Sequence, residues 1–165
     1  MVDEAFIDFL PTEASLARDL PARAVVLRSF GKTYGLAGVR LGFAIAQAEL
    51  AERMRAELGP WSVSGPALEI GCRALRDDAW LQAARERLTA DGARLDGMLR
   101  AAGVEIGGGT ILFRLSRHAD AASVVQRLGQ HGIHVRAFPD WPDQLRFGLP
   151  ADEEAFRRLA AALGV

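Results

Sequence analysis

The stretch from Ser29 to Gly42 constrains this chain more than any other. Its sequence, SFGKTYGLAGVRLG, contains Lys32, the only lysine among 20 lysine and arginine residues. A lysine can lose its proton and attack a carbonyl group, whereas an arginine stays charged. The pattern therefore indicates a Schiff-base lysine. The alternative is a strong bias toward arginine that left one lysine by chance.

Two short apolar runs flank this lysine. Residues 25–27 and 41–46 are typical of buried strands, and four glycines in the same stretch permit tight turns or the close approach of a ligand. We therefore expect Lys32 on a loop between two strands, where reactive residues are often placed. Ser29 and Arg40 have side chains suited to binding a phosphate.

The spacing S-x-x-K-x-x-G-L-x-G-x-R-x-G resembles the cofactor-lysine segment of the class I and II aminotransferases. These enzymes use pyridoxal phosphate (PLP) and have the fold-type I architecture. The resemblance implies that Lys32 forms the covalent bond to the cofactor and that Ser29 and Arg40 hold the cofactor phosphate.

A second resemblance lies at residues 1–9, which read as the end of a strand that runs into a loop. The D-E-A-F segment is similar to the family's D-E-A-[YF] motif, and it makes Asp3 the candidate partner of the pyridine nitrogen. A strand-end turn with solvated carboxylates is the alternative. Phe6 departs from the tyrosine that many members carry, whose hydroxyl binds the phenolic oxygen of the cofactor.

The D-E-A-F-I-D-F-L-P run, taken with S-F-G-K, resembles one branch of the family, the threonine-phosphate decarboxylases of cobalamin biosynthesis. The function that this implies is decarboxylation of L-threonine O-3-phosphate to aminopropanol phosphate. A histidinol-phosphate type of transamination is the alternative. From another class, a non-catalytic remnant or interaction module also fits the sequence.

Two arginines in the second half are candidate substrate ligands. Arg146 lies within the short apolar run LRFG, where a buried charge needs an anion from the protein or from a ligand. The resemblance places it on the carboxylate or phosphate of an amino acid or amino phosphate substrate. Arg136 is similarly placed in phosphate-binding relatives, with a surface arginine as the alternative.

The fold expected from the resemblance is α/β, part of the fold-type I large domain followed by a small C-terminal α/β sandwich. We expect residues 1–76 to belong to the PLP-binding domain, residues 77–102 to form a long linking helix and residues 103–165 to form the small domain. Within the first part, residues 13–20 are predicted to form a short surface helix. Cys72 is predicted to be a buried, inert thiol.

Composition excludes several function classes. The net charge of −1 gives no sign of a nucleic-acid partner, and no apolar run is long enough to cross a membrane. The three histidines lack metal-ligand spacing. One cysteine cannot form an internal disulfide, so a cytoplasmic protein is expected. The resemblance covers only the C-terminal half of a family member, which is a homodimer, so we expect little activity from this chain alone.

Overall fold

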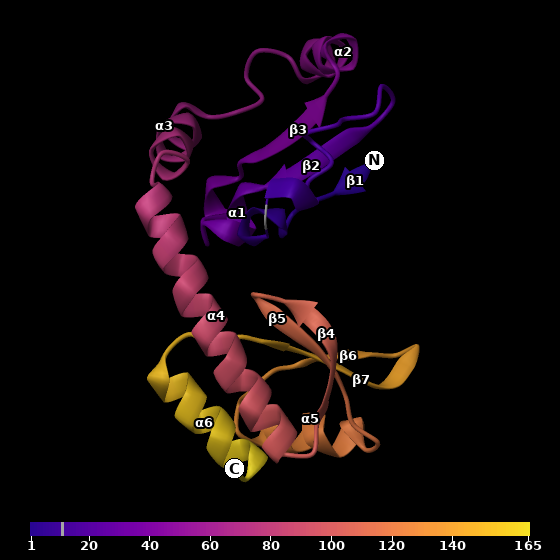
Figure 1. Cartoon of the computed structure of the whole chain (residues 1–165), viewed down its shortest axis with the longest axis vertical. Coiled ribbons are helices and arrows are strands. Elements are labelled where there is room, and N and C mark those ends of the chain that lie inside the picture. The colour runs from indigo at the N-terminus through magenta and orange to yellow at the C-terminus, as the bar shows by residue number, and fades with distance from the viewer. Residues whose placement is uncertain (11) are drawn as a thin grey trace. The chain divides into compact units, whose positions relative to one another are not determined.

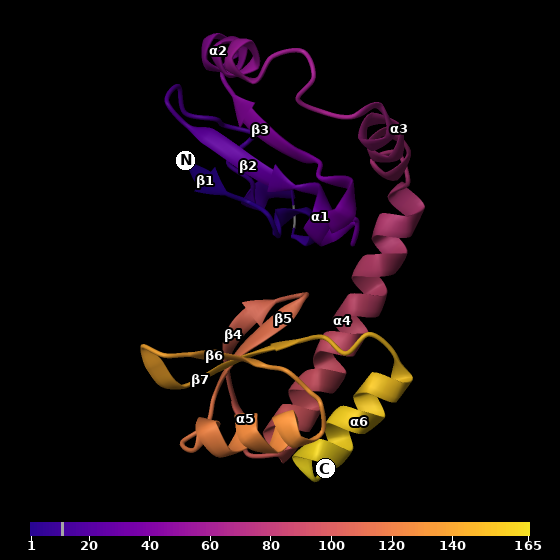
Figure 2. The ribbon, with the colours of Figure 1, turned by 180° about the vertical axis from the view of Figure 1, so that it is seen from behind.

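The computed structural model describes residues 1–10 and 12–165, and it divides into two compact units, Met1–Trp80 and Leu81–Val165. Figures 1 and 2 show the chain from opposite sides. Each unit combines a sheet with helices, which confirms the predicted mixed α/β class. The three-part division at residues 76 and 102 stays a prediction.

The first unit is built on a three-stranded sheet, whose strands lie side by side in Figure 1. It consists of β1 (Val2–Asp3), β2 (Val25–Ser29) and β3 (Gly42–Ala46). β2 is central: it pairs in parallel with β1 and antiparallel with β3. Its β-branched start suits a strand, and Val26 is fully buried.

The prediction that Lys32 lies on a loop is wrong, because Lys32 lies in the one-turn helix α1 (Phe30–Thr33). Ser29 still has the extended backbone of β2, and the Tyr34 amide donates to the Phe30 carbonyl oxygen to close the turn. Phe30 is buried and anchors this turn. The remaining helices of the unit are the 3-10 helices η1 (Ile7–Phe9), η2 (Thr12–Ala14) and η3 (Ala37–Val39), and the α-helices α2 (Ala48–Leu58) and α3 (Gly65–Ala74).

The predicted helix over residues 13–20 is wrong, because the chain forms only η2 followed by turns. The buried side chain of Glu4 competes for this segment. Its carboxylate accepts the Ser15 hydroxyl at 2.8 Å and the Leu16 amide at 2.8 Å. A side chain that takes up backbone donors in this way offers an alternative to the helical ladder.

Cys72 is exposed, so the predicted burial of its thiol is also wrong. α3 buries only Ala67 and Gly71, and α2 buries none of its residues. Trp61, between these helices, is 92% exposed. Helical apolar spacing in this unit is therefore not matched by burial within the described residues.

The second unit has a four-stranded antiparallel sheet in the order β4-β5-β7-β6. Its elements are α4 (Asp78–Ala101), which begins at the end of the first unit, β4 (Glu105–Thr110), β5 (Phe113–Arg117), α5 (Ala121–Gln130), β6 (Arg136–Phe138), β7 (Trp141–Gly148) and α6 (Glu153–Leu163). Asp120 and Asp152 cap α5 and α6 by accepting backbone N–H donors.

The core of this unit lies between the sheet and its three helices; Figure 2 shows α5 below the strands and α4 passing alongside them. Leu95 and Leu99 of α4 share one cluster with Leu145 and Phe147 of β7 and with residues of α5 and α6. Because strand side chains alternate, Arg146 lies on the opposite face of the sheet from its two neighbours. No helix of the described chain has the length and apolarity to span a bilayer.

Gly109 of β4 lies at a tightly packed position beside β5. Gly109 has φ +147°, and a Cβ there would lie 2.3 Å from the Phe113 carbonyl oxygen. We expect Gly109→Ala to lower the free energy of unfolding of this unit by about 2 kcal/mol, measured in urea. Gly97→Ala in α4 is the matched control: it meets open space, and it should stabilise by about 0.5–1 kcal/mol. Equal effects of the two changes would contradict this reading.

Candidate active site

The sheet of the first unit places two predicted cofactor ligands on one face. Asp3 of β1 pairs in register with Leu27, and Ser29 lies two residues further along β2. Side chains two residues apart on a strand share a face, so Asp3 and Ser29 lie on the same side of the sheet. Asp3 is exposed and accepts the Ala5 amide at 2.9 Å, and Ser29 makes no capping hydrogen bond.

Lys32 follows directly in α1, and its side chain is exposed. Its Nζ lies 5.8 Å from the centre of the Phe6 ring. The residue that departs from the family's tyrosine is thus next to the predicted reactive lysine. Because it is exposed, the Lys32 amine is not desolvated by the described residues.

Arg40 has an unusual backbone. It ends η3 with φ 57° and ψ 41°, and among the described residues no other non-glycine residue has positive φ. This left-handed conformation costs an arginine about 1 kcal/mol or more, and such strain is concentrated at functional sites. Its guanidinium is exposed and donates to the Ala37 carbonyl oxygen at 3.0 Å.

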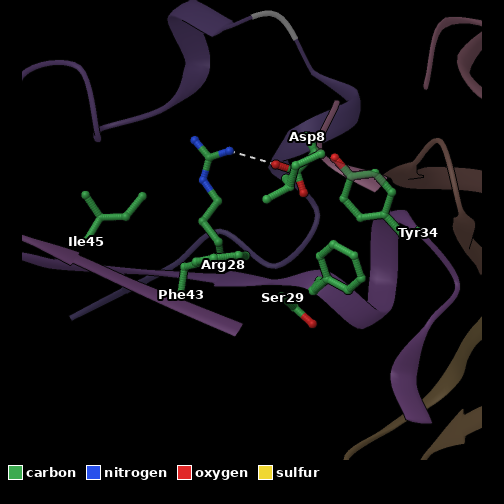
Figure 3. A pocket seen from close by; sticks show the side chains of 8 residues that line it. Asp8, Arg28, Ser29, Tyr34, Phe43 and Ile45 are labelled. Atoms are coloured by element: carbon green, nitrogen blue, oxygen red, sulfur yellow. Dashed lines mark hydrogen bonds and ion pairs between the residues drawn. The ribbon is translucent and has the colours of Figure 1, made fainter. Parts of the chain in front are cut away.

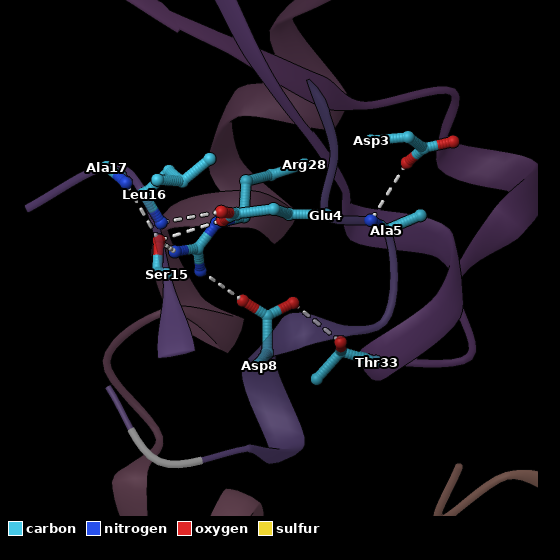
Figure 4. A network of polar contacts seen from close by, with 9 residues as sticks. All are labelled: Asp3, Glu4, Ala5, Asp8, Ser15, Leu16, Ala17, Arg28 and Thr33. Carbon is cyan, nitrogen blue, oxygen red and sulfur yellow. Dashed lines mark hydrogen bonds and ion pairs between the residues drawn. The ribbon is translucent and has the colours of Figure 1, made fainter. Parts of the chain in front are cut away.

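A polar network that sequence reasoning missed lies on the opposite side of the sheet from Asp3 and Ser29 (Figure 4). Its centre is Arg28, which pairs with Asp8 at 2.7 Å and with Glu4 at 3.2 Å. Its Nη2 donates to the Ser15 hydroxyl oxygen at 2.7 Å, and the Thr33 hydroxyl donates to Asp8 at 2.6 Å. The available signal was an arginine inside an apolar strand, the same signal that singled out Arg146.

Beside this network lies a mostly apolar pocket of about 250 Å³ (Figure 3). It is lined by Asp8, Arg28, Ser29, Phe30, Tyr34, Phe43, Ile45 and Leu75. Figure 3 shows the Ser29 oxygen directed away from the Arg28–Asp8 pair. The pocket therefore does not coincide with the face that carries Asp3 and the Ser29 hydroxyl.

Tyr34 borders the pocket and stacks between Phe30 and Trp80, with ring centres 4.6 Å and 5.7 Å away. Burial raises the pKa of this phenol, and the negative charges of Asp8 and Asp78 raise it further.

Because Tyr34 is the only tyrosine, its tyrosinate absorbance can be titrated directly. We expect the folded chain to titrate above the value of about 10 found for the unfolded chain in denaturant. Linkage then sets the sign: the stability that Tyr34 contributes is present below pH 10 and is lost as pH rises through the folded pKa. Asp8→Asn should lower the folded pKa without removing the whole shift. A folded titration at or below the unfolded one would contradict the assignment.

In the second unit, Arg136 and Arg146 lie directly opposite each other on β6 and β7. Arg146 is half-buried, not buried as predicted, because its face of the sheet is not the one that the helices cover. The guanidinium carbon of Arg136 lies 5.2 Å from the centre of the Phe138 ring. That of Arg146 lies 5.1 Å from the centre of the Phe113 ring. Among the described residues no carboxylate pairs with either arginine, so two adjacent cations are left that an anion would stabilise.

The residues of the first unit fit the groups of PLP. An amine, a hydroxyl, a guanidinium and a carboxylate match its aldehyde, its phosphate and its pyridine nitrogen. Gly31 helps to place them: a Cβ there would lie 2.7 Å from the Cα of Ala37, so glycine allows η3, which Arg40 follows directly, to approach α1. In the described part of the chain no cluster of His, Cys, Asp or Glu could hold a metal ion.

Comparison with known proteins identifies the family. The family model "Aminotransferase class I and II" matches residues 1–163. A threonine-phosphate decarboxylase from Pseudomonas aeruginosa is 44% identical over 99% of this chain, and a histidinol-phosphate aminotransferase from Rhizobium meliloti is 30% identical over 98%. The chain spans about half the length of these relatives, 49% and 48%.

The fold matches that of a solved aminotransferase structure. The histidinol-phosphate aminotransferase from Clostridium acetobutylicum aligns with a TM-score of 0.86 and 21% identity, over 98% of this chain and 52% of that one. This confirms the predicted architecture. Because the family model covers nearly the whole chain, the chain belongs to the class I and II aminotransferases, the family whose cofactor is PLP.

Proposed function

We propose that this chain carries the cofactor lysine and the substrate arginines of a PLP-dependent decarboxylase acting on L-threonine O-3-phosphate. The observation that carries the proposal is the 44% identity to the P. aeruginosa decarboxylase, against 30% to the R. meliloti aminotransferase. The product of the proposed decarboxylation, aminopropanol phosphate, would enter cobalamin biosynthesis.

The two arginines that lie opposite each other on β6 and β7 also favour threonine phosphate as the substrate, on chemical grounds. Threonine phosphate carries two anionic groups, a carboxylate and a phosphate, whereas histidinol phosphate carries only the phosphate. Two guanidinium groups that lie opposite each other, and that no carboxylate of the described residues pairs with, suit a doubly anionic ligand; Arg146 and Arg136 are its candidate partners. By holding both ends of the substrate, they would orient the bonds at its Cα.

In the first unit, Lys32 would bind the cofactor aldehyde, Ser29 and Arg40 its phosphate, and Asp3 its pyridine nitrogen. When bound, PLP supplies an electron sink for the electron pair left at Cα. The Asp3 carboxylate would keep a proton on the pyridine nitrogen. The Lys32 amine, once released, would be the group that moves a proton at Cα. Phe6 cannot donate a hydrogen bond to the phenolic oxygen.

The function is tested by supplying PLP with threonine phosphate or histidinol phosphate and identifying products by mass spectrometry. The assay uses the chain alone and the chain mixed with the segment of the P. aeruginosa relative that it does not match. Carbon dioxide and aminopropanol phosphate support the proposal. Amino-group transfer from histidinol phosphate would establish the alternative. No product from either substrate, with no PLP on Lys32, would favour a non-catalytic remnant.

We also propose that the chain assembles as a homodimer. The support is the apolar surface of the first unit, where α2 buries nothing and Leu58 and Trp61 are 67% and 92% exposed. Leu58 and Trp61 are three positions apart in the chain, and large exposed apolar patches mark protein interfaces. Sedimentation equilibrium should give a dimer mass, and Trp61→Ser with Leu58→Ser should shift it toward the monomer. A monomer at all concentrations tested would refute the assembly.

A further inference from the structure

We propose that the network of Glu4, Arg28, Asp8 and Thr33 is a positioning device that holds Asp3 and Lys32 at a set spacing. This inference rests on the proposed function, because it assigns a role relative to the cofactor ligands. It adds residues that do not themselves touch a ligand.

The placement of the network along the chain is the first argument. Each predicted cofactor ligand next to the sheet has an immediate chain neighbour in the network. The pairs are Asp3 with Glu4, Ser29 with Arg28, and Lys32 with Thr33. Along β2, alternation sends Ser29 to the ligand face and Arg28 to the network. In α1, Lys32 is exposed while Thr33 is buried. Figure 4 shows this for Asp3 and Glu4, whose side chains point in different directions.

The continuity of the contacts is the second argument. From α1, the Thr33 hydroxyl donates to Asp8 at 2.6 Å, and Arg28 donates to Asp8 at 2.7 Å. Arg28 also donates to the Ser15 hydroxyl at 2.7 Å, which donates in turn to Glu4 at 2.8 Å, while the 3.2 Å contact of Arg28 with Glu4 is an ion pair without a hydrogen bond. Glu4 is bonded directly to Asp3 through the peptide chain. Side chains therefore join the segment of Asp3 to the segment of Lys32 across nearly thirty residues of sequence.

The burial of the network is the third argument. Glu4 is 7% and Thr33 is 4% exposed, and the Arg28 side chain is 24% exposed. Buried charge networks are weak sources of stability, because apolar residues of similar volume often serve equally well. What such a network adds is geometry, since its directional contacts are satisfied in only one arrangement. We therefore expect replacement of the whole network by apolar residues to affect placement more than stability, whereas removal of one charge alone leaves its partners unpaired and is costly.

Thr33 offers the sharpest test, because Thr33→Val removes the hydroxyl at nearly constant shape while Thr33→Ser keeps it. Hydrogen exchange is measured on the ligand-free chain, in peptides covering residues 1–6 and 30–36. We expect Thr33→Val to exchange about fivefold faster in both peptides, as for the loss of one hydrogen bond. Thr33→Ser should behave like the unchanged chain. Arg94→Gln, which breaks an exposed ion pair with Glu153 in the second unit, should alter neither peptide.

Two results would overturn the positioning role. One is faster exchange confined to residues 30–36, which would make Thr33 a local contact of α1. The other is an equal effect of Thr33→Val and Thr33→Ser, which would assign the change to packing.

A second readout separates this inference from the proposed function. PLP is added, the adduct is reduced with borohydride, and the label at Lys32 is compared with that at the N-terminal amine. We expect Thr33→Val to lower the ratio and Thr33→Ser to restore it. Absence of label at Lys32 in the unchanged chain would count against the proposed function, while the exchange result would still decide the positioning role.

Discussion

Lys32→Arg removes all borohydride-trapped PLP from residue 32, and this is the largest effect expected for any single substitution. The reason is chemical: an arginine keeps a positive charge on the chain but cannot attack the cofactor aldehyde. The measurement is peptide mass analysis of the reduced adduct, which can be assigned because the chain has no other lysine.

The N-terminal amine is the internal control for this experiment. Amino termini lose their proton near pH 8, whereas ordinary lysines do so above pH 10, so at neutral pH an aldehyde ordinarily reacts first with the terminus. Preferred labelling of Lys32 over Met1 would therefore show a site that favours the lysine. Label on Met1 alone, in the unchanged chain, would remove the basis for assigning Lys32 to the cofactor.

Arg28→Met lowers the free energy of unfolding of the first unit by about 3 kcal/mol. The substitution keeps a similar apolar stem but leaves the carboxylates of Glu4 and Asp8 without their cation in a largely buried place. Urea unfolding would be followed by hydrogen exchange in the peptide that contains β2, so that the second unit does not mask the change.

Two further variants test whether the loss comes from the buried ion pairs of Arg28. Arg55→Met breaks an exposed ion pair with Glu52 on α2, and it should cost at most about 0.5 kcal/mol. Glu4→Gln combined with Arg28→Met should recover part of the loss, because one stranded charge is gone. If Arg28→Met costs no more than Arg55→Met, the network is not a buried ion cluster in solution.

Several elements could be predicted from the sequence because their signals are local. The apolar run at residues 25–27, the helix expected over residues 77–102 and the mixed strands and helices expected in residues 103–165 match elements of the structure. The spacing from Ser29 to Gly42 indicated the family without any structure, because the motif is contiguous and combines several residue types at set intervals. The roles of Asp3, Ser29, Lys32, Arg40, Arg136 and Arg146 remain proposals.

The failed predictions concern features that depend on which segments meet after folding. Residues 13–20 have helical character, yet the carboxylate of Glu4 takes up the donors at Ser15 and Leu16. Cys72 lies in an apolar helix that buries little. Arg146 was expected to be buried by its apolar neighbours, but only the alternate residues Leu145 and Phe147 face the helices.

The sequence by itself determined the fold class, the family and the candidate ligands, because residue type and short-range spacing carry that information. Only the tertiary structure decided which ligands share a face, that Arg136 lies opposite Arg146, and that Arg28 joins Glu4 to Asp8 and thereby to Thr33. Strand register and side-chain networks depend on segments that meet only after folding. The energy of each such contact depends on both residues, so it cannot be inferred from either residue alone.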